Sequence, residues 1–202
     1  MAQTSAPETA SVKTPAEDLY GLEQSLLVCK KCPLAATRQQ VVFGTGSATA
    51  RLVLVGEAPG ADEDAQGVPF VGRAGQLLTK ILAAIGLVRE EVYIANVLKC
   101  RPPLNRDPNS QEVEQCEPFL IQQLEIIRPT LILALGRIAG NTLLKGTHSL
   151  GQMREQLHDY HGIPLMVTYH PAALLRNPHW KKPAWEDMKR VRAIYRGENI
   201  DE

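Results

Sequence analysis

The sequence LVLVGEAPGADEDAQGVPFVGRAGQLL, residues 52–78, decides the fold. Its first four residues are a short, valine-rich apolar run that predicts a strand buried on both faces. Glycines and a proline within residues 56–60 then break the chain into a tight loop. From Arg73 onward, apolar residues recur at helical spacing until Gly86, which is a typical helix stop. The stretch therefore predicts a strand, a long loop and a helix.

The loop in this stretch carries side chains that suit a ligand site. In an open parallel sheet, such a loop lies at the carboxyl edge of the strand, where ligands bind. It holds a carboxylate directly after the strand, Glu57, and one aromatic residue, Phe70. Three more acids lie between them: Asp62, Glu63 and Asp64. An ordinary strand-to-helix connection with its acids in solvent fits the stretch equally well.

The bulk composition suits one domain with a substantial core. The chain has 202 residues, with 22 basic and 22 acidic side chains, so its formal net charge is zero. This balance argues against a strongly basic surface over the whole molecule but not against a local basic patch for nucleic acid. Residues 1–16 are rich in Ala, Thr, Ser, Pro and Glu and predict a disordered tail, which leaves residues 17–202 as a single domain.

The sequence also predicts where the protein works. No apolar run approaches the roughly 20 residues that a membrane span needs. The N-terminal residues lack the basic start and apolar middle of a secretory signal. We therefore expect a cytoplasmic protein with no membrane partner, in a reducing setting where cysteines are metal ligands or free thiols rather than disulfides.

Further apolar runs alternate with helical patterns along the chain. Three of them predict strands, at residues 92–95, 131–135 and 165–167. Residues 33–50 look irregular, and residues 146–162 are polar with weak signals. Strands that alternate with helices predict an α/β fold with a parallel sheet between helix layers. Because Glu57, Asn96 and His170 each follow a different strand, their side chains are expected to converge on one pocket.

Four cysteines predict a metal site. Cys29 and Cys32 form a C-x2-C pair, whereas Cys100 and Cys116 lie 16 positions apart, separated by a proline-rich loop. Four thiolates suit either a tetrahedral zinc ion or an iron-sulfur cluster. Because only the first pair is close in sequence, the spacing favours a [4Fe-4S] cluster over the usual zinc pattern of two close pairs. The plain alternative is four unrelated buried cysteines.

Four motifs in a fixed order are more specific than any one of them. They are GEAPG at 56–60, PFVGRAG at 69–75, NVLKCRPP at 96–103 and HPAALLRNP at 170–178. Over about residues 18–196 the chain closely resembles the family 4 uracil-DNA glycosylases, the iron-sulfur-containing branch of their superfamily. The resemblance implies a three-layer α/β/α domain around a central four-stranded parallel sheet. It also implies a structural [4Fe-4S] cluster held by Cys29, Cys32, Cys100 and Cys116.

The resemblance further implies a DNA repair activity. Uracil, the product of cytosine deamination, would be flipped out of single- or double-stranded DNA, and hydrolysis of its N-glycosidic bond would leave an abasic site. Phe70 is expected to stack on the uracil ring. Asn96 is expected to read its amide edge, because a carboxamide offers one donor and one acceptor. The backbone around Ala58 would contact the base, and Glu63 would obstruct a C5 methyl group, so that thymine is rejected.

Two side chains are expected to carry the chemistry. Cleavage of the N1–C1′ bond leaves negative charge on uracil and positive charge on the sugar. His170 would donate a hydrogen bond to uracil O2 as that charge develops. Glu57 would stabilise the cationic sugar or orient water. The best-known uracil-DNA glycosylases carry Asp where this chain has Ala58, so the activation of water is expected to shift to Glu57.

Other residues in the motifs are expected to hold DNA. Leu174 has the superfamily's position for the wedge that fills the vacated stack. Candidates for phosphate contacts are the basic residues Arg73, Lys99, Arg101, Arg176, Lys181 and Lys182. The plain alternative is that Leu174 and Leu175 belong to the core and that the charges are solvated, which we favour for Lys181 and Lys182.

Two other classes of function share part of the pattern. An iron-sulfur electron carrier needs the cysteines but gives the pocket side chains no role. A non-catalytic DNA-binding module would use the same pocket without hydrolysis. A relative that traps its product covalently carries a basic, histidine-containing insert after the strand that ends at Asn96. Residues 101–109 contain no histidine, so we predict turnover, by a monomeric enzyme.

Overall fold

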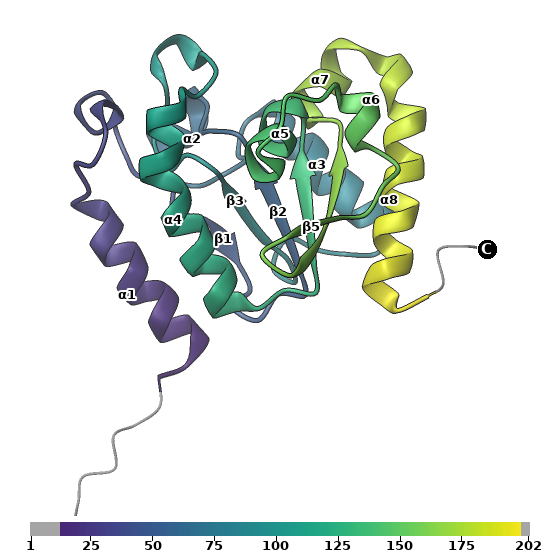
Figure 1. Ribbon diagram of the computed structural model, residues 1–202, viewed down its shortest axis with the longest axis horizontal. Helices are drawn as coiled ribbons and strands as arrows, with labels where there is room; N and C mark the ends of the chain where they lie inside the picture. Colours follow the sequence, from purple (N-terminus) through teal and green to yellow (C-terminus); the bar gives the residue numbers. More distant parts are fainter. Residues whose placement is uncertain (1–12, 199–202) are drawn as a thin grey trace, which may run out of the picture.

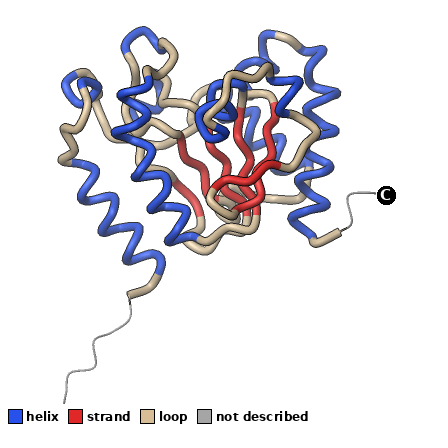
Figure 2. The backbone as a smooth tube through the Cα atoms, in the orientation of Figure 1, coloured by secondary structure: helices blue, strands red, loops and turns tan. Residues whose placement is uncertain are grey.

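The computed structural model describes residues 13–198, which form a sheet between two layers of helices (Figure 1). Figure 2 shows the strands in the middle and helices on both sides of them. The predicted α/β class and its three layers are therefore confirmed. Within the described range, none of the helices combines the length and the apolar character that a membrane span requires.

The sheet contains six strands in the order β1-β3-β2-β4-β6-β5. Their bounds are β1 Thr45–Gly46, β2 Leu52–Gly56, β3 Tyr93–Asn96, β4 Leu131–Leu135, β5 His158–Tyr160 and β6 Ile163–Thr168. The four central strands β3, β2, β4 and β6 are parallel, as predicted, whereas β1 and β5 pair antiparallel at the two edges. The expected four-stranded sheet is thus the centre of a wider, mixed one.

Both edge strands depend on left-handed turn positions rather than on apolar runs. Gly46 in β1 has a φ of 127°, and a Cβ atom there would lie 1.9 Å from the carbonyl oxygen of Val92. β5 and β6 form a hairpin whose turn residues, 161–162, both have positive φ, as a type I′ turn requires. Such short strands leave no hydrophobic alternation, so the expectation of irregular structure in residues 33–50 is wrong at β1, and the weak signals of residues 146–162 did not indicate β5.

Eight α-helices and three 3-10 turns connect the strands in the described part of the chain. The α-helices are α1 Pro15–Leu27, α2 Ala61–Gln66, α3 Arg73–Ala84, α4 Ser110–Ile127, α5 Arg137–Leu144, α6 Leu150–Met153, α7 Pro171–Arg176 and α8 Lys181–Arg196. The 3-10 turns cover Pro33–Ala36, Pro103–Asn105 and Pro178–Trp180. Helices α1, α4 and α5 pack on one face of the sheet, and α3 and α8 pack on the other.

The core divides along strand β2. Val53 and Val55 belong to the apolar cluster that includes α4, whereas Leu52 and Leu54 belong to the cluster that includes α3 and α8. All four side chains are buried, as expected for a strand covered on both faces. This packing fixes the register of the central strands, so their carboxyl ends meet at one edge of the sheet.

The first helix begins earlier than the sequence predicts. Thr14 caps α1: its hydroxyl oxygen accepts a hydrogen bond from the backbone N–H of Glu17, and its own backbone N–H donates to the Glu17 carboxylate. This capping box stabilises the helix from Pro15 onward. The predicted tail at residues 1–16 is therefore wrong for residues 13–16, and its first twelve residues lie outside the described range.

Candidate active site

A cavity of about 520 Å³ opens at the carboxyl edge of the central strands. It is lined by all six predicted catalytic and base-contacting residues and by one predicted DNA contact: Glu57, Ala58, Glu63, Phe70, Asn96, His170 and Arg176. These residues come from the ends of β2, β3 and β6, from the loop and short helix α2 after β2, and from the end of α7. The structure thus brings together side chains that are more than a hundred positions apart in the sequence. Arg73 and Leu174 do not line the cavity.

Strands β2 and β3 are neighbours, and Gly56 pairs directly with Asn96. A Cβ atom on Gly56 would lie 2.3 Å from Asn96 Oδ1 and 2.7 Å from Phe70 Cζ. Glycine is therefore required at this position, because any side chain would displace the two groups that stand over it. The first glycine of the GEAPG motif, Gly56, thus leaves space for the Asn96 and Phe70 side chains at the cavity wall.

Asn96 holds a polar atom with no partner. Its side chain is only 2% exposed, and within the described residues its Oδ1 accepts no hydrogen bond. An unpaired buried acceptor costs about 1–3 kcal/mol, and most buried polar groups in proteins are paired. An atom left unpaired at the wall of a cavity is available to a ligand that donates a hydrogen bond.

Phe70 is held in a strained conformation. Its φ is 55°, in the left-handed region, and its buried ring lies with its centroid 5.6 Å from that of the His170 ring. A Cβ atom on Gly75 would lie 1.7 Å from the Phe70 carbonyl oxygen, so the start of α3 must approach the loop without a side chain. Strained backbone persists only where its surroundings fix it, and it concentrates at functional sites.

Two charged side chains fix the loop that carries Phe70. One oxygen of the Glu63 carboxylate accepts hydrogen bonds from the N–H groups of Val71 and Gly72, at 3.0 and 3.1 Å. The other oxygen accepts from the Gly60 N–H at 3.1 Å. From the opposite side, Arg89 donates to the carbonyl oxygens of Phe70 and Pro69, at 3.2 and 2.9 Å. Arg89 lies in no motif, so the sequence did not indicate this role.

The His170 ring has a defined tautomer when it is neutral. Its Nδ1 accepts a hydrogen bond from the Ala172 backbone N–H at 3.1 Å, so the ring proton must reside on Nε2. The pKa of His170 is lowered to about 4, mainly by burial and also by the nearby Arg176 charge, against the opposing effect of Glu63. The imidazole is therefore neutral near pH 7 and can donate one hydrogen bond, from Nε2.

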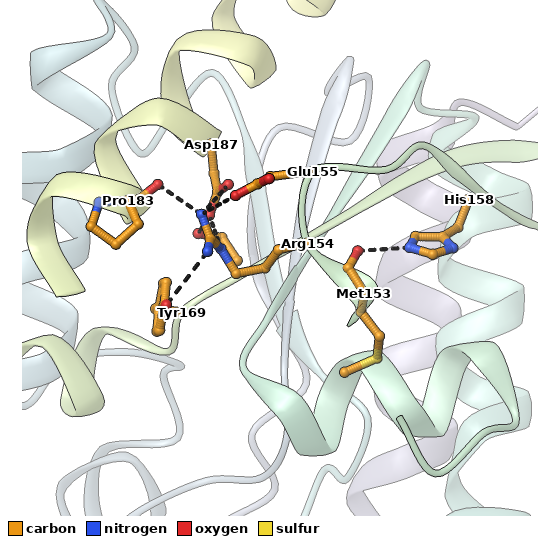
Figure 3. Close-up of polar contacts among 8 residues, drawn as sticks. Met153, Arg154, Glu155, His158, Tyr169, Pro183 and Asp187 are labelled. Atoms are coloured by element: carbon orange, nitrogen blue, oxygen red, sulfur yellow. Dashed lines mark hydrogen bonds and ion pairs between the residues drawn. The ribbon is translucent and has the colours of Figure 1, made fainter. Parts of the chain in front are cut away.

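A buried ion pair holds the chain just before His170 (Figure 3). Arg154 donates from Nε and Nη2 to the two carboxylate oxygens of Asp187, each at 2.8 Å. Thr168 donates to the same carboxylate at 2.6 Å, and Arg154 also contacts the Tyr169 hydroxyl at 3.4 Å. This network joins α8 to the end of β6 and fixes the position of His170. No motif in the sequence indicated it.

Glu57 has an unusual proton affinity. The pKa of Glu57 is raised to about 7, mainly by burial and also by the charge of Asp107, and Arg137 opposes both effects. Asp107 and Arg137 line the same cavity, together with Asn105. The sequence did not indicate these three residues, because the proline-rich loop and the start of α5 carry no periodic pattern that would place them at the sheet edge.

The predicted DNA contacts lie in different environments. Arg73 and Arg176 are exposed, at the start of α3 and the end of α7. Leu174 is only 2% exposed, whereas Leu175 is 38% exposed. In this conformation the structure supports the alternative that Leu174 belongs to the core, and its wedge role stays a prediction. Helix α7 would have to move before Leu174 could enter a base stack.

The predicted role of Lys99 has to be corrected. It is 0% exposed, so the expectation that it contacts DNA phosphate is wrong. Its Nζ donates to Gln123 Oε1 at 2.6 Å, and the Gln123 amide donates to the Tyr93 hydroxyl and the Phe43 carbonyl. Burial lowers the pKa of Lys99 to about 8. The residue lies between Asn96 and Cys100, and the chain turns it inward beneath α4.

The four cysteines lie near one another beside the first helix. Cys100 and Cys116 are buried with apolar neighbours, and Cys32 packs against them. Arg38 joins the segments: it donates to Cys100 Sγ at 3.3 Å and to the carbonyl oxygen of Cys29 at 2.9 Å. The Lys99 backbone N–H donates to Cys116 Sγ at 3.2 Å. We call this group of four cysteines the cysteine corner.

The [4Fe-4S] cluster at the cysteine corner stays a prediction. Within residues 13–198, no three His, Cys, Asp or Glu side chains are arranged to hold one metal ion. A [4Fe-4S] cluster takes one thiolate at each of four irons, so its ligands stand farther apart than the ligands of one zinc ion. N–H groups that donate to the sulfurs are typical of such sites, where they tune the bound group.

Comparison with known proteins agrees with this geometry. A family model described as "Uracil DNA glycosylase superfamily" matches residues 43–189. The type-4 uracil-DNA glycosylase of Archaeoglobus fulgidus is 44% identical over 184 residues, which cover 87% of this chain and 92% of the relative. The Pyrobaculum aerophilum enzyme is 43% identical over 91% of this chain and 96% of its own, and the Saccharolobus solfataricus enzyme is 44% identical over 81% and 80%. The chain therefore belongs to the uracil-DNA glycosylase superfamily and, within it, to the type-4 uracil-DNA glycosylases.

Proposed function

We propose that this uracil-DNA glycosylase holds one uracil, flipped out of DNA, in the cavity at the sheet edge and hydrolyses its N-glycosidic bond there. The observation that carries the proposal is the unpaired Oδ1 of Asn96, which stands beside the Phe70 ring in that cavity. The product is an abasic site, the substrate of the later steps of base excision repair.

Recognition of uracil follows from its hydrogen-bonding edge. Uracil N3–H can donate to Asn96 Oδ1, and the Asn96 amide can donate to uracil O4. Cytosine presents an acceptor at N3 and a donor at C4, so with the Asn96 amide in this orientation it would leave both Asn96 groups unpaired. A site built to hydrogen-bond one edge rejects a base with the opposite pattern strongly. Phe70 supplies the stacking surface for the ring.

Exclusion of thymine is assigned to Glu63 and the backbone around Ala58. Glu63 lines the cavity, and its carboxylate is fixed by three backbone N–H groups. A side chain that is fixed in this way cannot swing aside for a methyl group at C5. The rigid wall supports a steric role in selectivity, in addition to the role of Glu63 in ordering the loop.

Stabilisation of the departing base is assigned to His170. As the N1–C1′ bond breaks, negative charge collects on uracil, in part on O2. The neutral His170 ring can donate its Nε2–H to that oxygen, and the Ala172 N–H keeps the ring in the required tautomer. A donor that is already oriented in a water-poor site stabilises the developing charge without reorganisation.

Stabilisation of the sugar is assigned to Glu57. The developing cation at C1′ favours a nearby carboxylate, and the same group can orient the attacking water. Because Ala58 has no polar side chain, no other acid in the GEAPG motif can take this duty. The pKa of Glu57, near 7, makes the carboxylate form available at neutral and higher pH.

The four cysteines are proposed to hold a [4Fe-4S] cluster. Cys29 and Cys32 follow α1, Cys100 ends the segment after β3, and Cys116 lies in α4. A bound cluster would join these segments covalently, so its role would be structural. The cytoplasmic setting that the sequence predicts would keep the four thiols reduced and available as ligands.

A cleavage assay tests the proposed activity. The protein is incubated with labelled single- and double-stranded oligonucleotides that contain one uracil, and alkali then cuts any abasic site. Oligonucleotides with thymine or cytosine at the same position are the matched controls. We expect cleavage of the uracil strands alone. An electron carrier or a non-catalytic DNA-binding module would leave every strand intact, and that result would overturn the proposal.

A further inference from the structure

The proline-rich loop between Arg101 and Asn109 presents an apolar side chain to solvent. Leu104, at the tip of this loop, is 95% exposed, the highest value among the large hydrophobic residues that are exposed in the described chain. Its φ is 57°, and that of Asn105 is 53°. A left-handed backbone is unfavourable for residues with a side chain and points to a functional constraint where the structure maintains it.

The loop is braced, so Leu104 is held in place. Arg101 Nε donates to Asn105 Oδ1 at 2.8 Å, which spans the tip. Arg106 forms a two-pronged ion pair with Glu112, at 2.8 and 2.6 Å, and Glu112 is buried at the start of α4. These bonds hold the loop backbone on both sides of Leu104.

The tip of the loop stands at the rim of the uracil cavity. Asn105 and Asp107, on the chain directly after Leu104, line that cavity. Figure 1 shows the loop before α4 at the same end of the molecule as α7. Of the leucines near the rim, Leu174 is buried, so it cannot reach a base pair in this conformation.

We propose that Leu104 inserts into the base stack of double-stranded DNA beside the flipped uridine. This inference rests on the proposed function and adds a residue that favours extrusion of the base. An apolar side chain that enters a base step compensates for part of the stacking that is lost when a nucleotide leaves. Single-stranded DNA has no paired stack to open, so Leu104 matters for duplex substrates alone.

Single-turnover excision rates test the role of Leu104. Leu104→Ala should lower the rate on a uracil–guanine or uracil–adenine duplex about tenfold, because the wedge is lost, and change the rate on the same single strand less than about twofold. Leu104→Met, which keeps a long apolar side chain, should restore most of the duplex rate. Leu157→Ala, at an exposed leucine that does not line the cavity, is the matched control and should change neither rate.

A fluorescent reporter separates stacking from chemistry. A 2-aminopurine next to the uracil brightens when the stack opens, and Leu104→Ala should reduce this signal on duplex binding. Equal losses on single and double strands, or no loss on either, would overturn the proposal while leaving the glycosylase activity in place. A duplex-specific loss with Leu175→Ala and none with Leu104→Ala would assign the wedge to α7 instead. Absence of uracil excision by the unmodified protein on every strand would refute the proposed function itself.

Discussion

The cavity at the sheet edge and the cysteine corner lie at two ends of one short segment, Asn96 to Cys100. The polar atoms of the two regions differ in whether they have hydrogen-bond partners. In the cavity, Asn96 Oδ1 stands unpaired. In the corner, Cys100 and Cys116 each accept a hydrogen bond, from Arg38 and from the Lys99 backbone. An unsatisfied group awaits a transient ligand, whereas satisfied sulfurs suit a permanent one. This contrast distinguishes the proposed catalytic site from the proposed structural site, and the substitutions below test it.

The largest effect is expected at Asn96. Asn96→Ala removes the only side chain assigned to read the uracil edge, and excision should fall on the order of 10²–10³-fold, the usual cost of one oriented active-site donor. The visible absorbance of the proposed cluster should remain unchanged, because Asn96 is not one of its proposed ligands. If excision survives at a similar rate, the cavity has been assigned to the wrong ligand.

The reverse pattern is expected at the corner. Cys100→Ala removes a proposed cluster ligand, so the visible absorbance should disappear, and the melting temperature should fall by about 10 °C or more as the link between α1 and α4 is lost. The measurements are absorbance, iron content and thermal unfolding. An unchanged spectrum would exclude Cys100 as a ligand, and Asn96→Ala serves as the control for a change in the same segment.

The pH dependence of excision should report Glu57. Its pKa is raised to about 7, and the charged form is the useful one, so the rate should rise with pH through about 7 and level off above it. Asp107→Asn removes a negative charge that raises this pKa, so the rise should move to lower pH. Glu57→Gln should lower the rate and abolish the rise. If neither substitution changes the rise of the excision rate with pH, the titrating group is a residue other than Glu57.

The charged groups around Glu57 support this interpretation of the profile. Asp107 and Arg137 act on its carboxyl in opposite directions. The other charged side chains of the cavity are Glu63 and Arg176, and its one histidine, His170, is neutral above about pH 4. His170 should therefore contribute no change between pH 5 and 8. The rate measurements should be made at constant ionic strength, because DNA binding depends on salt.

The smallest effect is expected from the exposed basic residues. Arg176→Ala should weaken DNA binding several-fold and reduce the slope of log affinity against log salt by about one, as expected for one lost phosphate contact. Lys182→Ala, a neighbouring exposed lysine outside the cavity, should change neither quantity. Equal effects of the two substitutions would indicate general attraction instead of a defined contact.

The sequence predicted the parts of the fold that depend on apolar runs. The four parallel strands were found because residues such as Leu52 and Val55 are buried on both faces of the sheet. β1 and β5 were missed because two or three residues in an edge strand carry no periodic signal. The start of α1 at Pro15 was missed because a composition rich in Ala, Ser and Thr predicts a disordered tail, although a Thr in such a stretch can also cap a helix, as Thr14 does.

The residues of the candidate site were predicted where they directly follow strands. They were missed where a loop distant in sequence folds against the cavity. Glu57, Asn96 and His170 were placed together by topology alone, and the structure brings them to one cavity. Asp107 was missed because nothing local directs a proline-rich loop toward the sheet edge. Lys99 was predicted among the phosphate contacts, whereas long-range packing under α4 buries it.

The three hydrogen bonds that Glu63 accepts have a mechanical consequence. They stiffen the loop around Phe70 before any base arrives, so this part of the receptor adapts little to its substrate. Deformation during capture then falls on the nucleic acid instead of the protein. Uracils in soft surroundings, such as mismatches or flexible pyrimidine–purine steps, should accordingly be removed sooner than those in stiff tracts.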